Sequence, residues 1–346
     1  MSIFDDTKDY EDWLRGQCAV VEKDLRRKHE KMRADAFSFL RATYYRWARQ
    51  IEAVCPDLKD APRVLAVGDA HLENFGTWRD GEGRLVWGVN DFDEGAVMPY
   101  PFDLVRLAAS ARLAPHLAIA NGAACKAILD GYKRGLETPR PMLITGDEAW
   151  LPRSEEKPRD FWDKIDRLPG AKPPGAVTAA LKRTLPQGAS ALRFAASVRG
   201  SGSLGRPRYV VAAAWRGGRV AREAKALVGS AWDWAHGGAR RRSRFLDLAE
   251  GAYRSPDPLL GLANNFIYRR LAADSHKIDF DGYESAEQEK DLLDAMGFDL
   301  GSIHAADARA AKAVRRDLRA RPREWLRKAS KAAAVAVKDD HRQWAA

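Results

Sequence analysis

The chain has 346 residues, of which 45% are hydrophobic and 31% are charged, so it can bury a core and is neither disordered nor fibrous. No run approaches the ~18 consecutive apolar residues of a membrane span, and the first residues do not form a secretory signal. The three scattered cysteines suit a reducing compartment. We therefore expect a soluble, cytoplasmic protein without disulfides or a zinc site.

The net charge of +10 is concentrated near the C-terminus, where residues 309–331 hold ten basic and two acidic side chains. A basic segment of this kind can face nucleic acid or another polyanion. A solvated helix face with no specific partner is the more common reason for it, and we favour that interpretation. The sequence does not indicate an oligomeric state.

In the first part of the chain, the spacing of apolar residues predicts helices and two buried strands. Apolar side chains recur every three or four residues over residues 8–54, which predicts two helices. Short apolar runs at residues 64–67 and 84–90 predict strands that end in polar loops. Helical spacing resumes over residues 102–113 and 118–136.

The second part changes from a proline-rich connection to a sheet and then to helices. Residues 139–186 contain eight of the 17 prolines and predict a long connection that carries short helices. Glycine-rich turns separate three strand-like runs, which predicts an antiparallel sheet. The expected strands are residues 192–199, 209–215, 219–227 and 266–271, and the expected helices are residues 243–253 and 284–341.

This order of elements predicts an α+β fold in five parts. The parts are N-terminal helices, a region with the polar loops, a proline-rich connection, a small β region and a helical C-terminal region. Their expected boundaries are residues 1–60, 61–138, 139–191, 192–275 and 276–346.

Polar side chains gather directly after the first two predicted strands. Asp69, His71 and Asn74 follow the first strand, and Asp91 and Asp93 follow the second. Carboxylate and carboxamide oxygens suit Mg²⁺ that bridges phosphates better than they suit zinc. The Asp-x4-Asn spacing reproduces that of kinase catalytic loops, and the later Asp-Phe-Asp stands where the metal-binding Asp-Phe-Gly of kinases would follow. His71 would orient its loop or touch a substrate, and Asp93 would hold metal or support a ligand.

A glycine-rich hairpin between two predicted strands forms the second motif. Residues 200–205 read Gly-Ser-Gly-Ser-Leu-Gly, and a strand rather than a helix follows them. This context is typical of the loop that covers the phosphates of ATP in kinases. The next strand carries Arg222 and Lys225 on opposite faces, and the sequence does not decide which of them would hold the phosphates. The candidate nucleotide-binding residues are Gly200, Ser201, Gly202, Ser203, Gly205, Arg222 and Lys225.

These motifs resemble the aminoglycoside and choline type of small-molecule kinases in the protein-kinase-like superfamily. More closely, residues 34–110 and 194–310 resemble a bacterial family known only as a domain of unknown function. The motifs that carry the resemblance are Asp69-x-His71-x-x-Asn74, Asp91-Phe92, Pro101-Phe-Asp103-Leu and the strand set of residues 198–224.

The resemblance implies a bilobal protein-kinase-like fold that binds ATP and Mg²⁺. It implies that Asp69 is the catalytic base, that Asn74 and Asp91 hold Mg²⁺, and that Asp103 braces the catalytic loop from the following helix. One departure from the family concerns the binding of phosphate: the family's Lys-Glu-Ala is Arg-Glu-Ala here, at residues 222–224. Arginine does not simply replace the point charge of a lysine.

The order of the motifs differs from that of an ordinary kinase, because the polar loops precede the glycine hairpin by about 130 residues. Reading the chain from residue 198 restores the kinase order, which predicts a circular permutation. Residues 64–110 and 284–330 should then share a large helical lobe, and residues 194–271 should form a small sheet lobe over it. The hairpin should lie within the length of a nucleotide triphosphate from the polar loops.

The sequence therefore predicts an ATP- and Mg²⁺-dependent phosphotransferase with an unidentified hydroxyl acceptor. We expect a small-molecule acceptor, although a protein acceptor or the transfer of AMP fits the same motifs. One alternative is a metal-dependent hydrolase that uses Asp69, His71, Asp91 and Asp93 as ligands. Another is a catalytically silent nucleotide-binding protein that docks on a polyanion through its basic segment.

Overall fold

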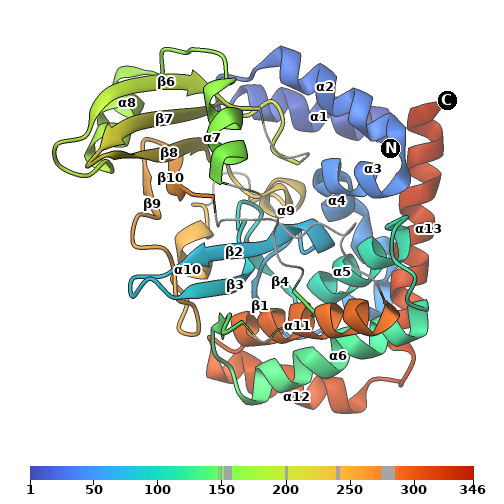
Figure 1. The fold of residues 1–346 in the computed structure, drawn as a ribbon. Helices are drawn as coiled ribbons and strands as arrows, with labels where there is room; N and C mark the ends of the chain where they lie inside the picture. The colour runs from blue at the N-terminus through green and yellow to red at the C-terminus, as the bar shows by residue number, and fades with distance from the viewer. Residues whose placement is uncertain (147, 149, 152–157, 199–201, 239–241, 274–284) are drawn as a thin grey trace.

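Helices and small antiparallel sheets make up the computed structural model of this chain, which confirms the α+β class (Figure 1). The structure describes residues 1–146, 148, 150–151, 158–198, 202–238, 242–273 and 285–346. None of the described helices combines the length and the apolar character that crossing a membrane requires.

The N-terminal region forms four helices, so the prediction of two helices over residues 8–54 is wrong. The break before the third helix is set by Asp35, which has an extended backbone and accepts a hydrogen bond from the Ser38 N–H at 2.8 Å. Thr43 separates the last two helices. The helices are α1 (Ile3–Arg15), α2 (Glu22–Ala34), α3 (Ala36–Ala42) and α4 (Tyr44–Val54), followed by the 3₁₀ turn Pro56–Leu58.

Two small sheets hold the polar loops. The expected strands appear as β1 (Arg63–Ala66) and β3 (Leu85–Val89), and β1 pairs with β4 (Ala96–Pro99). Sequence patterning missed β2 (Phe75–Arg79), which forms a hairpin with β3 and starts directly after the 3₁₀ turn Leu72–Asn74. The short strand β5 (Met142–Leu143) also pairs with β3.

The larger sheet has the strand order β6-β7-β8-β10-β9 among the described residues, with antiparallel neighbours. Four of its strands fall where the sequence predicts them, and β9 does not. The strands are β6 (Ser190–Ala196), β7 (Arg208–Trp215), β8 (Gly218–Ala226), β9 (Gly261–Ala263) and β10 (Phe266–Leu271).

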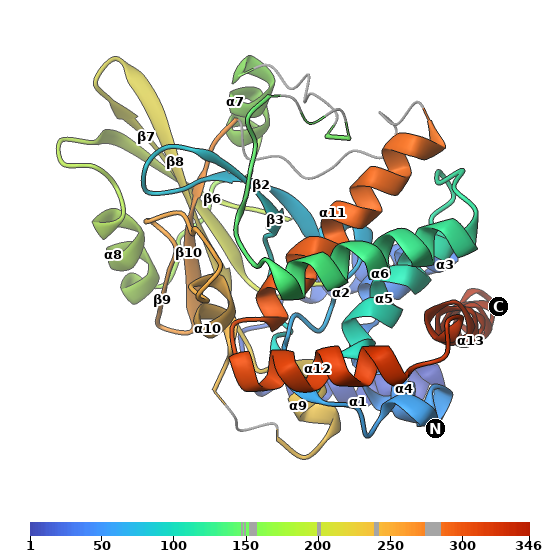
Figure 2. The ribbon, with the colours of Figure 1, turned by 90° about the horizontal axis from the view of Figure 1, so that it is seen from below.

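Two helices from the proline-rich connection cover opposite faces of this sheet (Figure 2). Phe161 and Ile165 of α7 (Pro158–Asp166) pack on Val210 and Ala212. On the other face, α8 (Gly175–Arg183) packs on Val211 and Ala224. The alternation of side chains along a strand therefore assigns each residue of β7 and β8 to one of two different environments.

The remaining helices form the larger part of the molecule (Figures 1 and 2). Helix α6 packs along α11, and α5 packs on α13, so the early and late helical regions share one core as expected. The helix predicted near residues 243–253 is shorter in the structure. These helices are α5 (Pro101–Leu113), α6 (Asn121–Glu137), α9 (Ala231–Ala235), α10 (Phe245–Ala249), α11 (Ala286–His304), α12 (Ala308–Ala320) and α13 (Trp325–Ala345).

Candidate functional site

The loop after β1 is fixed by a buried carboxylate from α5. Asp103 is fully buried and accepts hydrogen bonds from the N–H groups of Val67 and Gly68, at 2.7 and 2.8 Å. The His304 Nε2 atom lies 3.1 Å from the same carboxylate. Gly68 has a φ of +83°, and a Cβ there would lie 2.3 Å from the Glu94 carbonyl oxygen. The expected bracing of this loop by Asp103 is therefore present.

Asp69 follows in this loop and pairs with Arg106, also from α5. The Asp69 Oδ1 atom accepts hydrogen bonds from Arg106 Nε at 2.9 Å and from Nη2 at 2.6 Å. Burial raises the pKa of Asp69 above its ordinary value, and the Arg106 charge opposes this. A carboxylate with a raised pKa, held in one orientation, is suited to accept a proton. Sequence reasoning assigned no role to Arg106.

Asn74 ties the two polar loops together. Its Nδ2 atom donates hydrogen bonds to the backbone carbonyls of Asp69 and Asp91, both at 3.0 Å. This arrangement directs the amide hydrogens at the backbone and leaves the carboxamide oxygen for a ligand. His71 begins the same 3₁₀ turn, where its Nδ1 atom accepts from the Glu73 N–H. The His71 Nε2 atom lies 3.7 Å from Asp69 Oδ2.

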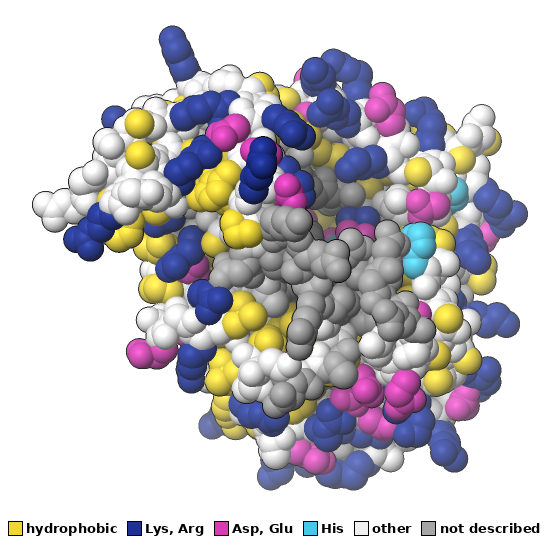
Figure 3. Space-filling model, in the orientation of Figure 1, with side chains coloured by type: hydrophobic (Ala, Val, Ile, Leu, Met, Phe, Trp, Pro, Cys, Tyr) yellow, Lys and Arg dark blue, Asp and Glu magenta, His cyan; other side chains and the backbone are white. Residues whose placement is uncertain are grey.

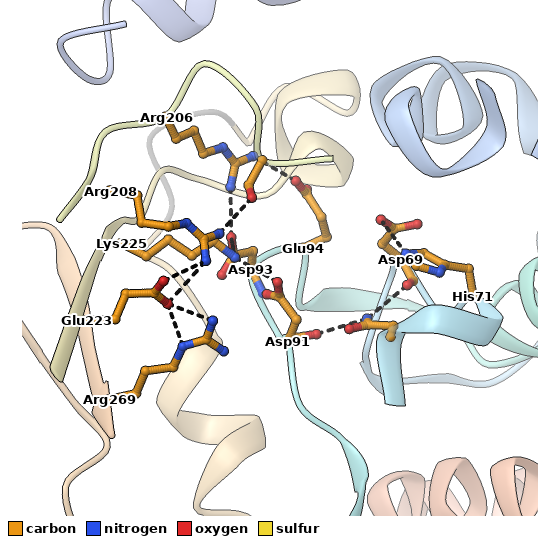
Figure 4. A network of polar contacts seen from close by, with 12 residues as sticks. Asp69, His71, Asp91, Asp93, Glu94, Arg206, Arg208, Glu223, Lys225 and Arg269 are labelled. Atoms are coloured by element: carbon orange, nitrogen blue, oxygen red, sulfur yellow. Dashed lines mark hydrogen bonds and ion pairs between the residues drawn. The ribbon is translucent and has the colours of Figure 1, made fainter. Parts of the chain in front are cut away.

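Asp91 and Asp93 meet the side chain of Lys225 from β8 (Figure 4). The Lys225 Nζ atom lies 2.7 Å from Asp91 Oδ2 and 2.5 Å from Asp93 Oδ2. Burial alone would raise the pKa of Asp91, but Lys225 holds it well below the ordinary value. Burial and the charge of Asp91 raise the pKa of Asp93 to about 6. The Asp93 Oδ1 atom is buried without a hydrogen-bond partner in the described part of the chain.

The two candidate cations of β8 lie on different faces of the sheet. Lys225 faces the polar loops, whereas Arg222 faces the side covered by α8, where its Nε atom donates to the Thr184 carbonyl at 3.0 Å. The structure therefore places Lys225, and not Arg222, at the acidic cluster. Glu223, which lies between Arg222 and Lys225 in the sequence, is fully buried and pairs with Arg208 and Arg269. Burial alone would raise the pKa of Glu223, but these two cations lower it to about 2.

Arg206 joins the glycine hairpin to the second polar loop, a role that sequence reasoning missed. Its guanidinium donates to Asp93 at 3.1 Å, to Glu94 at 2.9 Å and to the Tyr10 hydroxyl at 3.0 Å. The other Glu94 oxygen accepts from the Ala231 N–H at the start of α9. Arg206 is 5% exposed, so this network lies inside the protein and not on its surface.

The glycine hairpin lies against the first polar loop, as expected. A Cβ on Gly202 would lie 3.6 Å from Asp69 Oδ2 and 3.1 Å from the Arg41 carbonyl oxygen. The Ser203 hydroxyl accepts a hydrogen bond from Arg208 at 3.0 Å, and Gly205 has a φ of +95° and packs on Leu25. Two further candidates of this motif, Gly200 and Ser201, lie outside the described residues.

A pocket of about 640 Å³, part of it open to solvent, connects these groups. One side carries the acidic side chains and Asn74, together with Gly202 and Ser203 of the hairpin. The other side comes from the N-terminal helices. Their contribution to the lining is Tyr10, Lys28, Arg41, Ala42, Tyr44 and Tyr45.

The donors around Asp91 fit a hard cation better than a transition metal. Asp91 is ionised, Asn74 presents a carboxamide oxygen and Asp93 has an unpaired buried oxygen. Mg²⁺ is commonly held by one or two carboxylates together with phosphate oxygens. Within the described ranges, no three or more His, Cys, Asp or Glu side chains are grouped as metal ligands. Asp69, His71, Asp91 and Asp93, the ligands of the alternative hydrolase, are thus not grouped as one metal-ligand cluster in this part of the chain.

Residues 20–139 match a family model described as an uncharacterized protein conserved in bacteria (DUF2252). The match covers Asp69, Asn74 and Asp91, but it does not extend to the glycine hairpin or to Lys225. It supports the expected similarity to a bacterial family of unknown function over this part of the chain. No curated protein and no solved structure matches the chain.

Proposed function

We propose that this protein is an ATP- and Mg²⁺-dependent phosphotransferase with a circularly permuted, bilobal kinase-like fold. The sheet of β6 to β10 with α7 and α8 would be the small lobe, and the remaining helices with β1 to β5 would be the large lobe. Helix α11 follows β10 in the chain and packs against α6 and β1, which is compatible with a large lobe assembled from both ends of the sequence.

One observation carries the proposal: two motifs more than 130 residues apart meet in one pocket. Gly202 of the hairpin lies beside Asp69, and Lys225 is bonded to Asp91 and Asp93. A glycine hairpin, a lysine, a base and a metal-binding aspartate are the parts that phosphoryl transfer from ATP requires. Turn capping by unrelated polar residues does not explain why these particular types converge.

The side chains divide the reaction between them. Asp69, held by Arg106, would accept the proton of the acceptor hydroxyl. At the same time the hydroxyl oxygen of the acceptor would form a bond to the γ-phosphorus of ATP, and the bond between this phosphorus and ADP would break. Lys225 would hold phosphate oxygens, and the hairpin backbone would cover them. Asn74 and Asp91 would hold Mg²⁺, which would neutralise charge on the phosphates.

The first test compares variants in their consumption of [γ-³²P]ATP with Mg²⁺ in the presence of a cell extract that supplies acceptors. Asp91→Asn should lower turnover by at least about 100-fold, because it removes the charge that would hold the metal. Lys225→Met should lower turnover by at least about tenfold. Arg222→Met is the matched control, since it removes a cation from the other face of the same strand and should stay within about twofold of the wild type.

The outcomes separate the proposal from its rivals. Undiminished turnover by Asp91→Asn would overturn the assignment. Thermal stabilisation by ATP with Mg²⁺, without turnover, would indicate a silent nucleotide-binding protein. Label from [α-³²P]ATP on the acceptor would indicate transfer of AMP instead. On the face in Figure 3, Lys and Arg side chains lie around the rim and are mixed with Asp and Glu.

A further inference from the structure

A buried lysine on α2 faces the proposed reaction site from the side of the N-terminal helices. Lys28 is 2% exposed and lines the same pocket as Asp69. Its Nζ atom lies 5.1 Å from the centre of the Tyr45 ring and 5.7 Å from that of Tyr10. Aromatic faces at such distances stabilise a cation, but they do not satisfy its hydrogen-bonding capacity.

Within the described part of the chain, no hydrogen bond or ion pair engages the Lys28 ammonium group, because its neighbours are bonded elsewhere. Glu11 is bonded to His29 Nε2 at 2.6 Å. The Tyr10 hydroxyl is bonded to Arg206, and the Tyr45 hydroxyl lies 2.8 Å from Thr7 Oγ1. A buried charge without a partner is costly, so the pocket is arranged for a group that the chain itself does not provide.

A second cationic side chain of the pocket has a free donor of the same kind. Arg41 pairs with Glu73 through Nη2, while its Nε atom is buried without a partner among the described residues. Burial lowers the pKa of Lys28 to about 8, against the pull of Glu11, and the side chain is still mainly protonated at pH 7. Two cationic side chains in one pocket, of which Lys28 has no partner, favour an anionic oxygen group as the ligand.

We propose that Lys28 binds an anionic group of the acceptor, so that the substrate is a small alcohol carrying a phosphate or a carboxylate. This inference rests on the proposed phosphotransferase function. The anion would contact Lys28, the carbon skeleton would lie along the stacked Tyr10 and Tyr45 rings, whose centres are 4.5 Å apart, and the hydroxyl would point at Asp69.

The test measures binding by isothermal titration calorimetry with saturating Mg-ADP, so that the nucleotide phosphates occupy the acidic side. The probes are glycerol 3-phosphate, glycerate and, as the uncharged comparison, glycerol. Glycerol 3-phosphate or glycerate should bind at least about 30-fold more tightly than glycerol, and Lys28→Met should remove that difference. Lys31→Met, at an exposed position of the same helix, is the matched control and should change nothing.

A measurement on the wild type tests the inference even if Lys28→Met fails to fold. The affinity for glycerol 3-phosphate should fall about tenfold per pH unit once Lys28 loses its proton above about pH 8. Equal binding of charged and uncharged probes, no binding of either anion below ~10 mM, or full affinity in Lys28→Met would each overturn the inference. If the anions bind but Mg-ATP is neither bound nor consumed, the proposed function fails and the anion site stands. If Mg-ATP is consumed and Lys28→Met changes neither this consumption nor the binding of the anions, the proposed function stands and the anion site fails.

Discussion

Two walls of the pocket are held in place by different kinds of bonds. The acidic wall, formed by the loops that carry Asp69 and Asp91, is fixed from behind by buried carboxylates that bind backbone N–H groups. Asp103 binds the first loop, and Asp299 accepts from the Val89 N–H at 2.7 Å before the second. The hairpin wall, formed by residues 202–206 and Lys225, meets the acidic wall through ion pairs.

This difference indicates how the site would work with a nucleotide. Hydrogen bonds between backbone and buried carboxylates do not depend on a ligand, so the acidic wall is organised in advance. The ion pairs of Lys225 with Asp91 and Asp93 join groups that would instead face phosphate and metal. A ligand can therefore replace these bonds at the hairpin wall without disturbing the acidic wall.

The largest expected effect comes from removing the brace of the acidic wall. Asp103→Ala leaves the buried N–H groups of Val67 and Gly68 without an acceptor, so the free energy of unfolding should fall by about 3–5 kcal/mol. Asp307→Ala is the matched control, because Asp307 also accepts from two backbone N–H groups but caps α12 at the surface. It should cost about 1 kcal/mol. Urea denaturation measures both, and equal losses would contradict the picture of a pre-organised wall.

The next effect concerns the helices behind the acidic wall. Helices α6 and α11 approach closely at glycines, and a Cβ on Gly297 would lie 2.1 Å from the Ile128 carbonyl oxygen. Gly297→Ala should therefore force the helices apart and lower the free energy of unfolding by about 3 kcal/mol. Gly122→Ala, in α6 but with its nearest neighbour 3.9 Å away, should change it by less than about 1 kcal/mol. A mild effect of Gly297→Ala in urea denaturation would show that this packing tolerates adjustment.

Much of the acidic wall could be predicted from the sequence, because its residues follow strands at a fixed spacing. Asp69, Asn74 and Asp91 lie within a short stretch of chain, so local patterning was enough to group them. The choice between Arg222 and Lys225 was beyond that reasoning. Strand alternation separates the two faces, but only the position of α8 on one of them shows which face meets the acidic wall.

The charged residues that sequence reasoning missed have no local signal. Lys28 is close in the sequence to Arg26, Arg27 and Lys31, and this composition predicts a solvent-exposed helix. Which of these side chains is buried depends on how α2 packs. Arg206 reaches Asp93 across 113 residues of chain. A single sequence does not encode such contacts as a pattern, since they follow from the tertiary arrangement of elements that are individually ordinary.

The smallest expected effect tests the side of the pocket that neither wall supplies. Because burial lowers the pKa of Lys28 from 10.5 to about 8, the unfolded chain binds this proton more tightly than the folded protein does. The stability contribution of Lys28 is then fully present above pH 10.5, the pKa in the unfolded chain. It is lost as the pH falls through about 8, the pKa in the folded protein. Between pH 7 and 9.5 the wild type should therefore gain about 2 kcal/mol in the free energy of unfolding relative to Lys28→Met. Urea denaturation of both proteins at the two pH values measures this, since all other titrations cancel in the difference. A constant difference would mean that Lys28 titrates as an exposed lysine does, and would contradict its burial as an unpaired cation.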